Sequence, residues 1–422
     1  QKALIEMISR VLPYNHFLYI REHPHWPKYF SYKFLKTLKS FDLKDKRVLI
    51  RVDFNVPVEN ELVTDDFRIR SALPTIKHCL NEGAKIILIS HMGRPNGKFD
   101  SNLSLMPAGE KLADLLEMPI KFSDNCISED AHDVTLGLRS GEVHLLENLR
   151  FHIEETNNDQ NFSINLAKHG QVFINDAFGT AHRSHASNLG VSKYFNQKGM
   201  GFLIDKELEF LDEAMKVPKK PLTLVLGGAK IDTKIDLINR FIQIADHILI
   251  GGGMAFTFLK AKGKNIGASL VDETMLSQAK IIMANARGKT NLIFPSDLIC
   301  AKSMNDKDSS IFNSNEIPED LMGLDIGPST IKNFSDVIAA SGTILWNGPM
   351  GVFEVDGFHN GAESIGMATK NESITIVGGG DSAAAIKKFE MIHNFSHVST
   401  GGGAALSLLS GNTMPAIYAL EI

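Results

Sequence analysis

The sequence is poor in cysteine and has no long apolar run. Its 422 residues include three cysteines, Cys79, Cys126 and Cys300, which are isolated from one another and form no C-x-x-C pair. An odd number of scattered cysteines argues against a disulfide framework and a structural zinc site, and it is typical of a reducing compartment. No apolar stretch reaches the roughly 18–20 residues of a membrane-spanning helix, so we expect a soluble protein without a membrane partner.

Most of the chain also lacks an excess of positive charge. The net charge is −5, and residues 1–40 contribute +5 to it through seven basic and two acidic residues, so the rest carries −10. Sequence-independent binding to nucleic acid depends on a broad basic surface. We therefore expect no nucleic-acid partner.

Residues 1–40 differ from the rest of the chain. They are aromatic, poor in acids and without alternating strand-like and helix-like segments. Two interpretations stay open, an organelle-targeting segment and translated upstream sequence. We expect a cytoplasmic protein, with organelle targeting by residues 1–40 as the alternative.

From Lys46 onward, short apolar runs alternate with segments of helical spacing. The runs are 47–52, 84–90, 142–147, 171–175, 221–226, 247–250, 291–294, 343–346, 374–377 and 397–400. Near-continuous apolar strands separated by helices predict parallel sheets covered on both faces, an α/β fold. The length suits two domains of roughly 200 residues each.

The segment KELEFLDEAM (206–215) predicts an amphipathic helix at the domain joint. The P-K-K-P segment at 218–221 ends it and starts a new strand. The alternative is an ordinary crossover helix within one larger sheet. The predicted divisions are an extension (1–40), a first domain (41–204), an interdomain helix (205–216) and a second domain (217–405).

Ligands of parallel α/β sheets bind beyond the carboxyl ends of the strands. In the first half these positions hold charged and polar side chains: Asp53, Asn55, His91, Arg94, Asn148, Arg150, Asp176, His182 and Arg183. In the second half they hold mostly glycine with lysine: Gly227, Gly228, Lys230, 251–253, 347–351, 378–381 and 401–403. The difference predicts two anionic ligands, one per domain, bound by different means.

Four arginines lie in or near the strand-end loops of the first half: Arg68, Arg94, Arg150 and Arg183. A guanidinium group can form paired hydrogen bonds with a carboxylate or a phosphate. Each arginine alone is equally well read as a solvated surface residue. Their shared position favours a small, highly anionic substrate.

The glycine-rich loops GGAK (227–230) and GGGDS (378–382) stand at strand–helix junctions. Glycine lets the backbone approach a phosphate, and the N–H groups of the next helix face it. Tight strand–helix packing is the alternative for any single loop. The recurrence of such loops in one domain favours the binding of a phosphate.

Other motifs are incomplete. A P-loop ending at Gly288, Lys289 and Thr290 would need glycine where Met283 stands. Gly378, Gly380 and Ala383 fit a dinucleotide-binding pattern, but Ser399 and Thr400 occupy the place of its acidic residue. A dinucleotide oxidoreductase of the NAD type stays as the alternative function. The pair His182 and His185 lacks a third metal ligand nearby and is better read as part of an anion site.

Nine segments together resemble the phosphoglycerate kinase family. They are RVDFNVP (51–57), SHMGRP (90–95), LLENLRF (145–151), NDAFGTAHRSH (175–185), GGAKIDTK (227–234), IGGGMAFTFLK (250–260), WNGPMGVFE (346–354), VGGGDS (377–382) and STGGGA (399–404). The resemblance implies two Rossmann-like domains joined by a helix and a hinge, with residues from about 406 to 422 returning to the first domain. It also implies reversible phosphoryl transfer in glycolysis, from 1,3-bisphosphoglycerate to ADP, giving 3-phosphoglycerate and ATP.

The resemblance also implies the site residues. The 3-phosphoglycerate site would comprise Asp53, Phe54, Asn55, Arg68, His91, Met92, Gly93, Arg94, Arg150 and Arg183. The nucleotide site would comprise Lys230, Lys234, Gly252, Gly323, Asn347, Glu354, Gly379, Gly380, Asp381 and Ser382, with Asp381 meeting Mg²⁺. Ser382 stands where the family usually has threonine, and serine retains the hydroxyl group.

The catalytic groups expected from this resemblance are Arg68, Lys230 and the backbone of Gly401, Gly402 and Gly403. No general base is expected, because a carboxylate acceptor with a pKa near 4 is already ionised at neutral pH. The expected state is a monomer that closes around its two ligands. An inactive nucleotide-binding relative is the second alternative.

Overall fold

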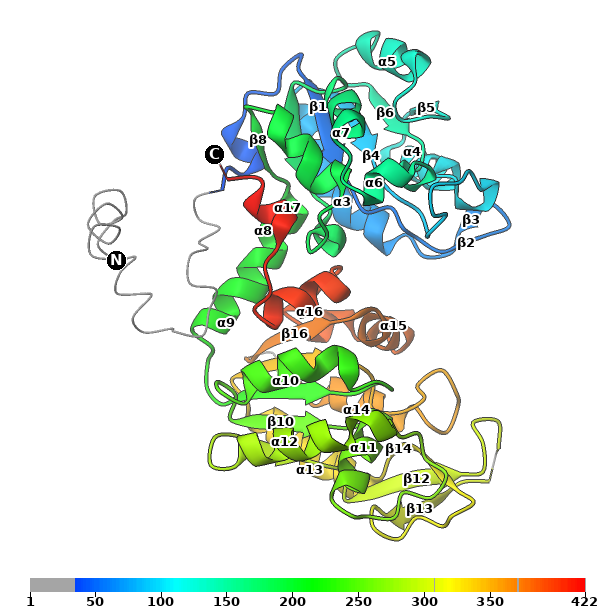
Figure 1. The fold of residues 1–422 in the computed structure, drawn as a ribbon, viewed down its shortest axis with the longest axis vertical. Coiled ribbons are helices and arrows are strands. Elements are labelled where there is room, and N and C mark those ends of the chain that lie inside the picture. Colours follow the sequence, from blue (N-terminus) through cyan, green and yellow to red (C-terminus); the bar gives the residue numbers. More distant parts are fainter. Residues whose placement is uncertain (1–34, 307, 370–371, 422) are drawn as a thin grey trace, which may run out of the picture.

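The computed structural model describes residues 35–306, 308–369 and 372–421, which fold around two parallel six-stranded sheets. The first contains β1 (Arg47–Arg51), β4 (Lys85–Ile89), β5 (Lys121–Ser123), β6 (Val143–Leu146), β7 (Val172–Asn175) and β8 (Lys198–Met200), in the order β5-β6-β4-β1-β7-β8. The second contains β9 (Leu222–Leu226), β10 (His247–Ile250), β11 (Asn291–Ile293), β15 (Thr343–Asn347), β16 (Ile374–Gly378) and β17 (His397–Val398), in the order β11-β10-β9-β15-β16-β17. We call the parts built on these sheets the first and the second lobe (Figure 1).

All ten predicted apolar runs form strands of these sheets. Their side chains alternate between two apolar clusters: Leu49 and Ile87 face one, while Val48 and Ile50 face the other. Because both faces are buried, the strands carry no polar alternation. The fold is therefore two Rossmann-like domains, each a parallel sheet flanked by helices, as the sequence predicts.

The helices cover both faces of each sheet. In the first lobe they are α3 (Phe67–Asn81), α4 (Met106–Leu116), α5 (Glu129–Leu136), α6 (Ile153–Thr156) and α7 (Gln160–Ala167). In the second lobe they are α10 (Ile235–Phe241), α11 (Met254–Ala261), α12 (Leu276–Ala286), α13 (Pro328–Ala340), α14 (Asn360–Met367) and α15 (Gly380–Lys388). Residues of α5 and α7 pack in one cluster and those of α3 and α4 in the other.

Several strands have no counterpart in the predicted set. Two of them, β5 and β8, form the edges of the first sheet. The second lobe also has an antiparallel sheet of β12 (Asp297–Ala301), β13 (Ser310–Asn313) and β14 (Met322–Ile326), and β2 (Val58–Glu59) pairs with β3 (Leu62–Val63). Of these strands, β2, β3, β5 and β13 are short or partly exposed, so they lack the apolar run that marks a buried strand.

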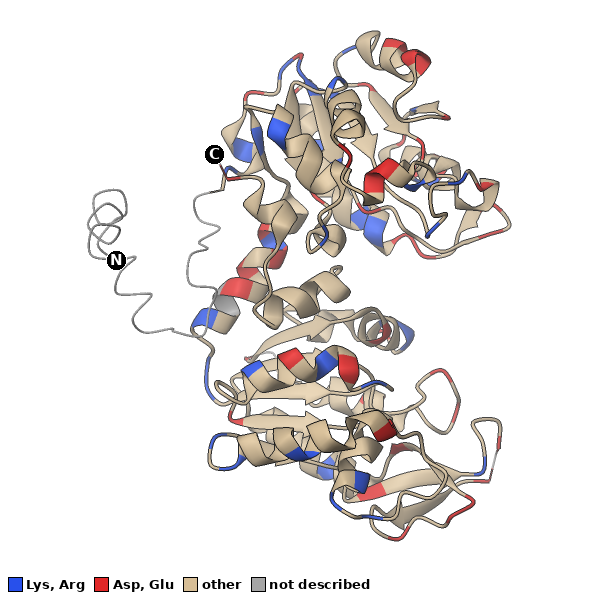
Figure 2. Cartoon of the chain, in the orientation of Figure 1, with Lys and Arg blue, Asp and Glu red and all other residues tan. Residues whose placement is uncertain are grey.

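One continuous helical segment joins the lobes. It consists of α8 (Phe202–Leu208), a π-helical turn η8 (Glu209–Glu213) and α9 (Ala214–Lys216), so it begins before the predicted residues 206–215. Acidic side chains are frequent along it (Figure 2). Its apolar residues Leu208, Leu211 and Met215 belong to a cluster that contains residues of both lobes.

The C-terminal helices α16 (Gly403–Leu409) and α17 (Pro415–Tyr418) follow β17. The Ala416 amide donates a hydrogen bond to the Ala181 carbonyl in the first lobe, at 3.1 Å. The chain thus returns to the first lobe after completing the second (Figure 1).

Most of the atypical N-terminal extension, residues 1–34, lies outside the described residues. Residues 35–40 pack on the first lobe: Thr37 pairs with Met200, and Leu38 is fully buried. In the described ranges no helix has the length and apolar character that a membrane span requires.

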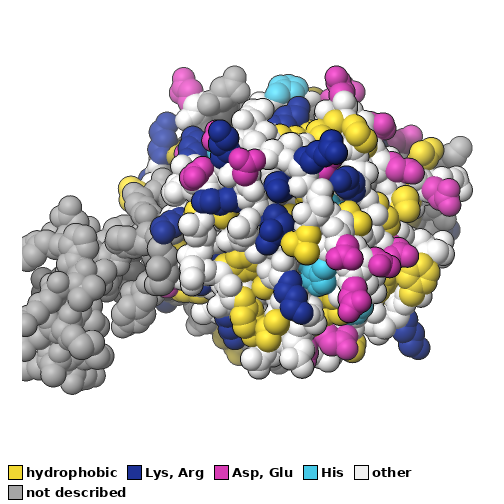
Figure 3. Space-filling view, turned by 90° about the horizontal axis from the view of Figure 1, so that it is seen from above, with side chains coloured by type: hydrophobic (Ala, Val, Ile, Leu, Met, Phe, Trp, Pro, Cys, Tyr) yellow, Lys and Arg dark blue, Asp and Glu magenta, His cyan; other side chains and the backbone are white. Residues whose placement is uncertain are grey.

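Acidic and basic side chains both occur on the end of the molecule formed by the first lobe, with Lys and Arg more frequent in the upper and central part of the view and Asp and Glu toward its right (Figure 3). This face carries neither a basic nor an acidic field of one sign.

Candidate active site

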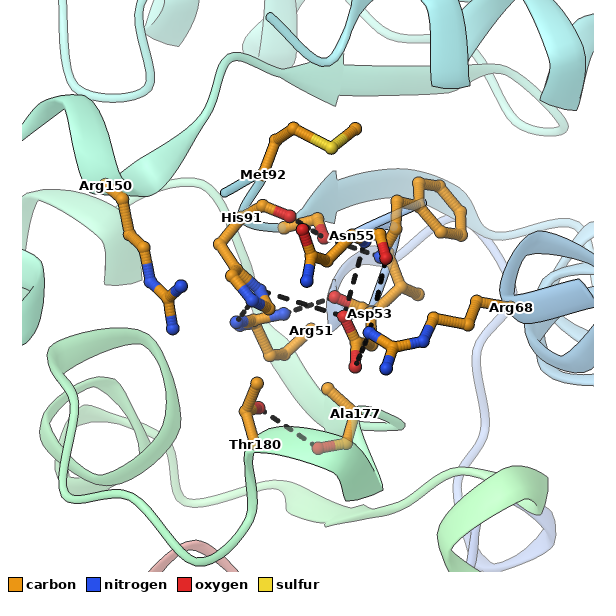
Figure 4. Close-up of polar contacts among 12 residues, drawn as sticks. Arg51, Asp53, Asn55, Arg68, His91, Met92, Arg150, Ala177 and Thr180 are labelled. Carbon is orange, nitrogen blue, oxygen red and sulfur yellow. Dashed lines mark hydrogen bonds and ion pairs between the residues drawn. The ribbon is translucent and has the colours of Figure 1, made fainter. Parts of the chain in front are cut away.

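The polar side chains after β1 and β4 meet at one edge of the first sheet (Figure 4). The Asn55 carboxamide oxygen accepts from the Gly93 amide at 2.9 Å, and Phe54 donates its amide to the Ser90 hydroxyl at 2.8 Å. Arg68, in the first turn of α3, donates to the Asp53 carboxylate at 3.0 Å and to the Asn55 carbonyl at 3.3 Å. The predicted residues Asp53, Asn55, Arg68, His91 and Gly93 are thus brought together.

His91 is held as a neutral acceptor. Arg51 lies 3.2 Å from its Nδ1 atom, and arginine can only donate. Burial lowers the pKa of His91 well below its usual value, and Arg51, Arg150, Arg183 and Arg68 lower it further. The Nε2 atom therefore carries the proton and is the donor left for a ligand.

Sequence reasoning missed Arg51, which lies inside an apolar strand and is fully buried. Its Nε donates to the Ser187 hydroxyl at 2.9 Å, and Ser187 donates to the Glu155 carboxylate at 2.6 Å. A charged residue within a strand that is buried on both faces requires such partners. The arginine inside an apolar run was therefore the available signal that buried polar partners exist. The sequence does not identify them, because Ser187 is 136 residues away from Arg51.

Arg150 is buried with part of its guanidinium group unsatisfied. One nitrogen donates to the Gly93 carbonyl at 2.6 Å, while Nε and the other terminal nitrogen have no hydrogen-bond partner. Burial lowers its pKa to about 10, and the charges of Arg183 and Arg51 add to the effect. In Figure 4, Arg150 and Arg68 approach the Asp53–His91 group from opposite sides.

The other two predicted arginines extend this group of cations. Burial lowers the pKa of Arg183, and the charge of Arg94 lowers it further. Arg94 is exposed, and Met92 is buried, with its amide bonded to the Asn148 side chain at 3.1 Å. Mutually repelling guanidinium groups, one of them unsatisfied, have the donors and the charge to pair with a small multivalent anion.

The second lobe contains a cavity of about 480 Å³ beyond the carboxyl ends of its strands. Four predicted nucleotide-site residues line it: Gly252, Gly323, Glu354 and Asp381. The remaining walls are largely apolar and include Phe256, Leu298, Met304, Leu324 and Val352. Sequence reasoning missed these residues, because an apolar side chain in a pocket gives the same pattern as one in a core.

The other predicted nucleotide-site residues shape the loops beside this cavity. The Asn347 side chain donates to the Gly378 carbonyl at 2.7 Å, and the Ser382 hydroxyl accepts from the Gly348 amide at 2.6 Å. Gly379 has φ of 101°, and a Cβ there would lie 2.7 Å from the Asn347 side chain. Glycine is needed at this position for both reasons.

The two predicted lysines differ in environment. Lys234 is buried and donates to the carbonyls of Gly227 and Asn347. Burial lowers its pKa to about 8, opposed by the charge of Asp381. Lys230 is exposed and does not line the 480 Å³ cavity. It is also absent from the walls of a second cavity, described next, which Arg68 lines.

A second cavity, of about 180 Å³, lies between the lobes. Arg68 and Asn55 line it from the first lobe, and Gly380 and Gly402 line it from the second. The loop 401–403 lies against the first lobe, because a Cβ at Gly401 would approach the Phe178 ring to 2.5 Å. The predicted loop and Arg68 therefore share one cavity.

A family model described as phosphoglycerate kinase matches residues 38–412. The chain belongs to the phosphoglycerate kinase family. It is 46% identical over 398 residues to a phosphoglycerate kinase of Thermosynechococcus vestitus, covering 93% of this chain and 99% of the relative. It is also 46% identical over 393 residues to one of Chlorobium phaeobacteroides, covering 92% and 99%.

Solved structures agree with the sequence relatives. The phosphoglycerate kinase of Coxiella burnetii superimposes with a TM-score of 0.82 at 37% identity, covering 92% of this chain and 98% of that one. That of Pyrococcus horikoshii gives 0.81 at 29% identity, covering 91% and 98%. The predicted function is confirmed: the chain is a glycolytic phosphotransferase with a carboxyl group as acceptor, using 3-phosphoglycerate and ADP or ATP. The oxidoreductase alternative has no support among these relatives.

Proposed function

We propose that the arginine group of the first lobe binds 3-phosphoglycerate and that the second lobe presents the nucleotide across the shared cavity. The observation that carries this assignment is the unsatisfied, buried guanidinium of Arg150 among like charges. An unpaired buried cation costs stability, so its retention favours an anionic ligand. Arg94, Arg150 and Arg183 would hold the phosphate, and His91 would donate through Nε2.

The nucleotide would occupy the 480 Å³ cavity. Its apolar walls suit a flat base, and Glu354 would accept hydrogen bonds from the ribose hydroxyls. Gly252 and Gly323 would allow close approach, while Lys234, Asn347 and Ser382 would keep the phosphate loops in shape. Gly379 and Gly380 would direct backbone N–H groups at the phosphates.

Asp381 suits Mg²⁺ brought in with the nucleotide. Its carboxylate lines the cavity at the first turn of α15, and Mg²⁺ is commonly bound by one or two carboxylates together with substrate phosphates. Once bound, the ion would neutralise phosphate charge.

The transfer itself needs positioning and charge neutralisation. The acceptor is a carboxylate that is already ionised, so no base has to remove a proton. Arg68 and Lys230 would neutralise the equatorial oxygens of the moving phosphoryl group, and the amides of 401–403 would add donors. Since Lys230 lies outside the Arg68 cavity, closure of the lobes would have to bring it in.

We also propose domain limits of 41–204 and 217–405, with residues 205–216 of the helical segment 202–216 as the connection and 406–422 returning to the first lobe. A monomeric, cytoplasmic enzyme is our working proposal. The three cysteines are free and buried, which suits a reducing compartment.

A coupled assay of Mg-ATP-dependent phosphorylation of 3-phosphoglycerate tests the activity. We expect turnover that requires both substrates and the divalent ion. Nucleotide binding without turnover would instead indicate an inactive relative.

A further inference from the structure

An ion pair joins the two lobes directly. The Lys387 ammonium lies 2.7 Å from an oxygen of the Asp65 carboxylate. Lys387 is in the last turn of α15 in the second lobe, and Asp65 precedes α3 in the first. The ion pair of His397 with Glu207 links the second lobe to the connecting segment 202–216. Among the other ion pairs of the described ranges, only that of Lys387 and Asp65 joins the two lobes.

On the second-lobe side, the pair belongs to one face of α15. Gly380, Ala383, Ala384 and Lys387 all line the cavity between the lobes. Their spacing of three and four residues places them along one side of the helix. The same helix carries Asp381 in its first turn, so Lys387 is rigidly connected to the nucleotide end of the second lobe.

On the first-lobe side, the pair belongs to the start of α3. Asp65 accepts a hydrogen bond from the Phe67 amide at 3.0 Å, and Arg68 is the next residue. Burial would raise the pKa of Asp65, but the hydrogen bonds from Lys387 and Phe67 outweigh it, so the pKa is lowered and the carboxylate stays charged. Asp65 and Arg68 both line the cavity that Lys387 lines.

We propose that Lys387 and Asp65 form a strut between α15 and α3, which helps to place Arg68 against the bound nucleotide when the lobes close. Both are positioning residues, since they act through the two helices. The inference rests on the proposed role of Arg68. It assigns a function to two residues that belong neither to the arginine group nor to the glycine-rich loops.

The expected size of the effect is modest. The side chains of Lys387 and Asp65 are 52% and 39% exposed, and partly exposed ion pairs change an equilibrium by about two- to five-fold. The pair is already formed before closure, so the population that changes is that of enzyme with α15 and α3 correctly placed, and this change would appear in kcat. Because salt screens exposed charges, it should fade at about 1 M salt.

The test is a double-mutant cycle on the full chain with Lys387→Ala, Asp65→Asn and the double variant. Asparagine keeps an acceptor for the Phe67 amide while removing the charge. We expect each single variant to lower kcat about two- to five-fold at low salt, with unchanged dissociation constants for 3-phosphoglycerate alone and Mg-ADP alone. The double variant should be no slower than either single one.

Two further variants separate the strut from a general effect of surface charge. Lys387→Arg keeps the charge and should retain the wild-type kcat. Lys332→Ala removes an exposed pair of the same length, 2.7 Å to Asp336 within α13, and should have no effect.

The strut is overturned if the two single effects add in the double variant. It is overturned equally if Lys387→Ala matches Lys332→Ala, or if Lys387→Arg loses as much activity as Lys387→Ala. A wild-type enzyme without phosphoryl transfer would contradict the activity itself, so the two failures are distinguishable.

Discussion

At the scale of single residues, Arg68 and Arg70 provide a direct comparison. Both lie in the first turn of α3, but Arg68 enters the cavity between the lobes, whereas Arg70 pairs with Asp66 at 2.9 Å on an exposed side. We expect Arg68→Ala to lower kcat by about 10²-fold or more, the scale of losing one transition-state donor. Arg70→Ala should remain near the wild-type rate. Steady-state kinetics decide, and equal effects of the two variants would remove Arg68 from the chemistry.

Replacing Arg150 should weaken the binding of 3-phosphoglycerate without lowering the stability of the ligand-free protein. Its partly unsatisfied guanidinium is costly in the free protein but available to an anion. We expect Arg150→Met to raise the dissociation constant of 3-phosphoglycerate by about 10- to 100-fold, as for a lost hydrogen bond to a charged group. The melting temperature of the ligand-free protein should not fall. Calorimetry and thermal melts measure both quantities, and a large loss of stability with intact binding would show that Arg150 is structural.

The residues at strand ends were predictable, because parallel strands bring their carboxyl ends to one edge. Asp53, Asn55 and His91 therefore meet where the sequence places them. Arg51 was not predictable in the same way. Its role depends on Ser187 and His91, and only the folded chain brings them to it.

At the scale of elements, the connecting helix begins four residues before the position that the sequence pattern predicts. The helical pattern begins at 206, but α8 starts at Phe202. Asp176, at the end of β7, accepts the amides of Leu203 and Ile204 at 2.8 and 3.4 Å. A cap supplied from 27 residues upstream leaves no local signal.

The same carboxylate should make stability depend on pH. Burial raises the pKa of Asp176 to about 7, although its hydrogen bonds oppose this. The folded state then holds the proton more tightly than the unfolded state, so this contribution to stability falls as pH rises from about 4 to 7. Relative to Asp176→Asn, the wild type should lose about 2 kcal/mol of unfolding free energy between pH 5 and pH 8. Urea unfolding at both values measures it.

Asp336→Asn is the control, because its carboxylate is largely exposed. Its difference from the wild type should stay constant over the same range. If Asp176→Asn also differs from the wild type by a constant amount, the carboxylate is ionised throughout, and the raised pKa is wrong.

At the scale of the whole molecule, the sequence predicted the content of each lobe better than their arrangement. The strands and helices within each lobe follow from buried apolar runs and helical spacing, which are local properties. The relative position of the lobes depends on the helical segment 202–216, on the returning C-terminus and on contacts such as Gly401 against Phe178. These contacts join residues hundreds of positions apart, so no periodicity reveals them.

Closure of the lobes is the prediction that belongs to this scale. Lys230 is exposed and outside the Arg68 cavity, yet both are assigned to the same phosphoryl group. We expect the lobes to approach one another when both ligands are bound, because only then do contacts from both sides favour the closed state. Glu129→Cys in α5 and Lys280→Cys in α12 place exposed labelling sites on opposite lobes. Cys79, Cys126 and Cys300 are buried and should label slowly.

Energy transfer between the two labels then reports the distance. It should increase with 3-phosphoglycerate and Mg-ADP together, and much less with either ligand alone. Both labels in the first lobe, for example at Glu129 and Asp42, should show no change and exclude an effect of ligand on the dyes. An unchanged signal in an enzyme with normal turnover would mean that the lobes already stand at the reactive distance, and that Lys230 reaches the phosphoryl group by local motion of its loop.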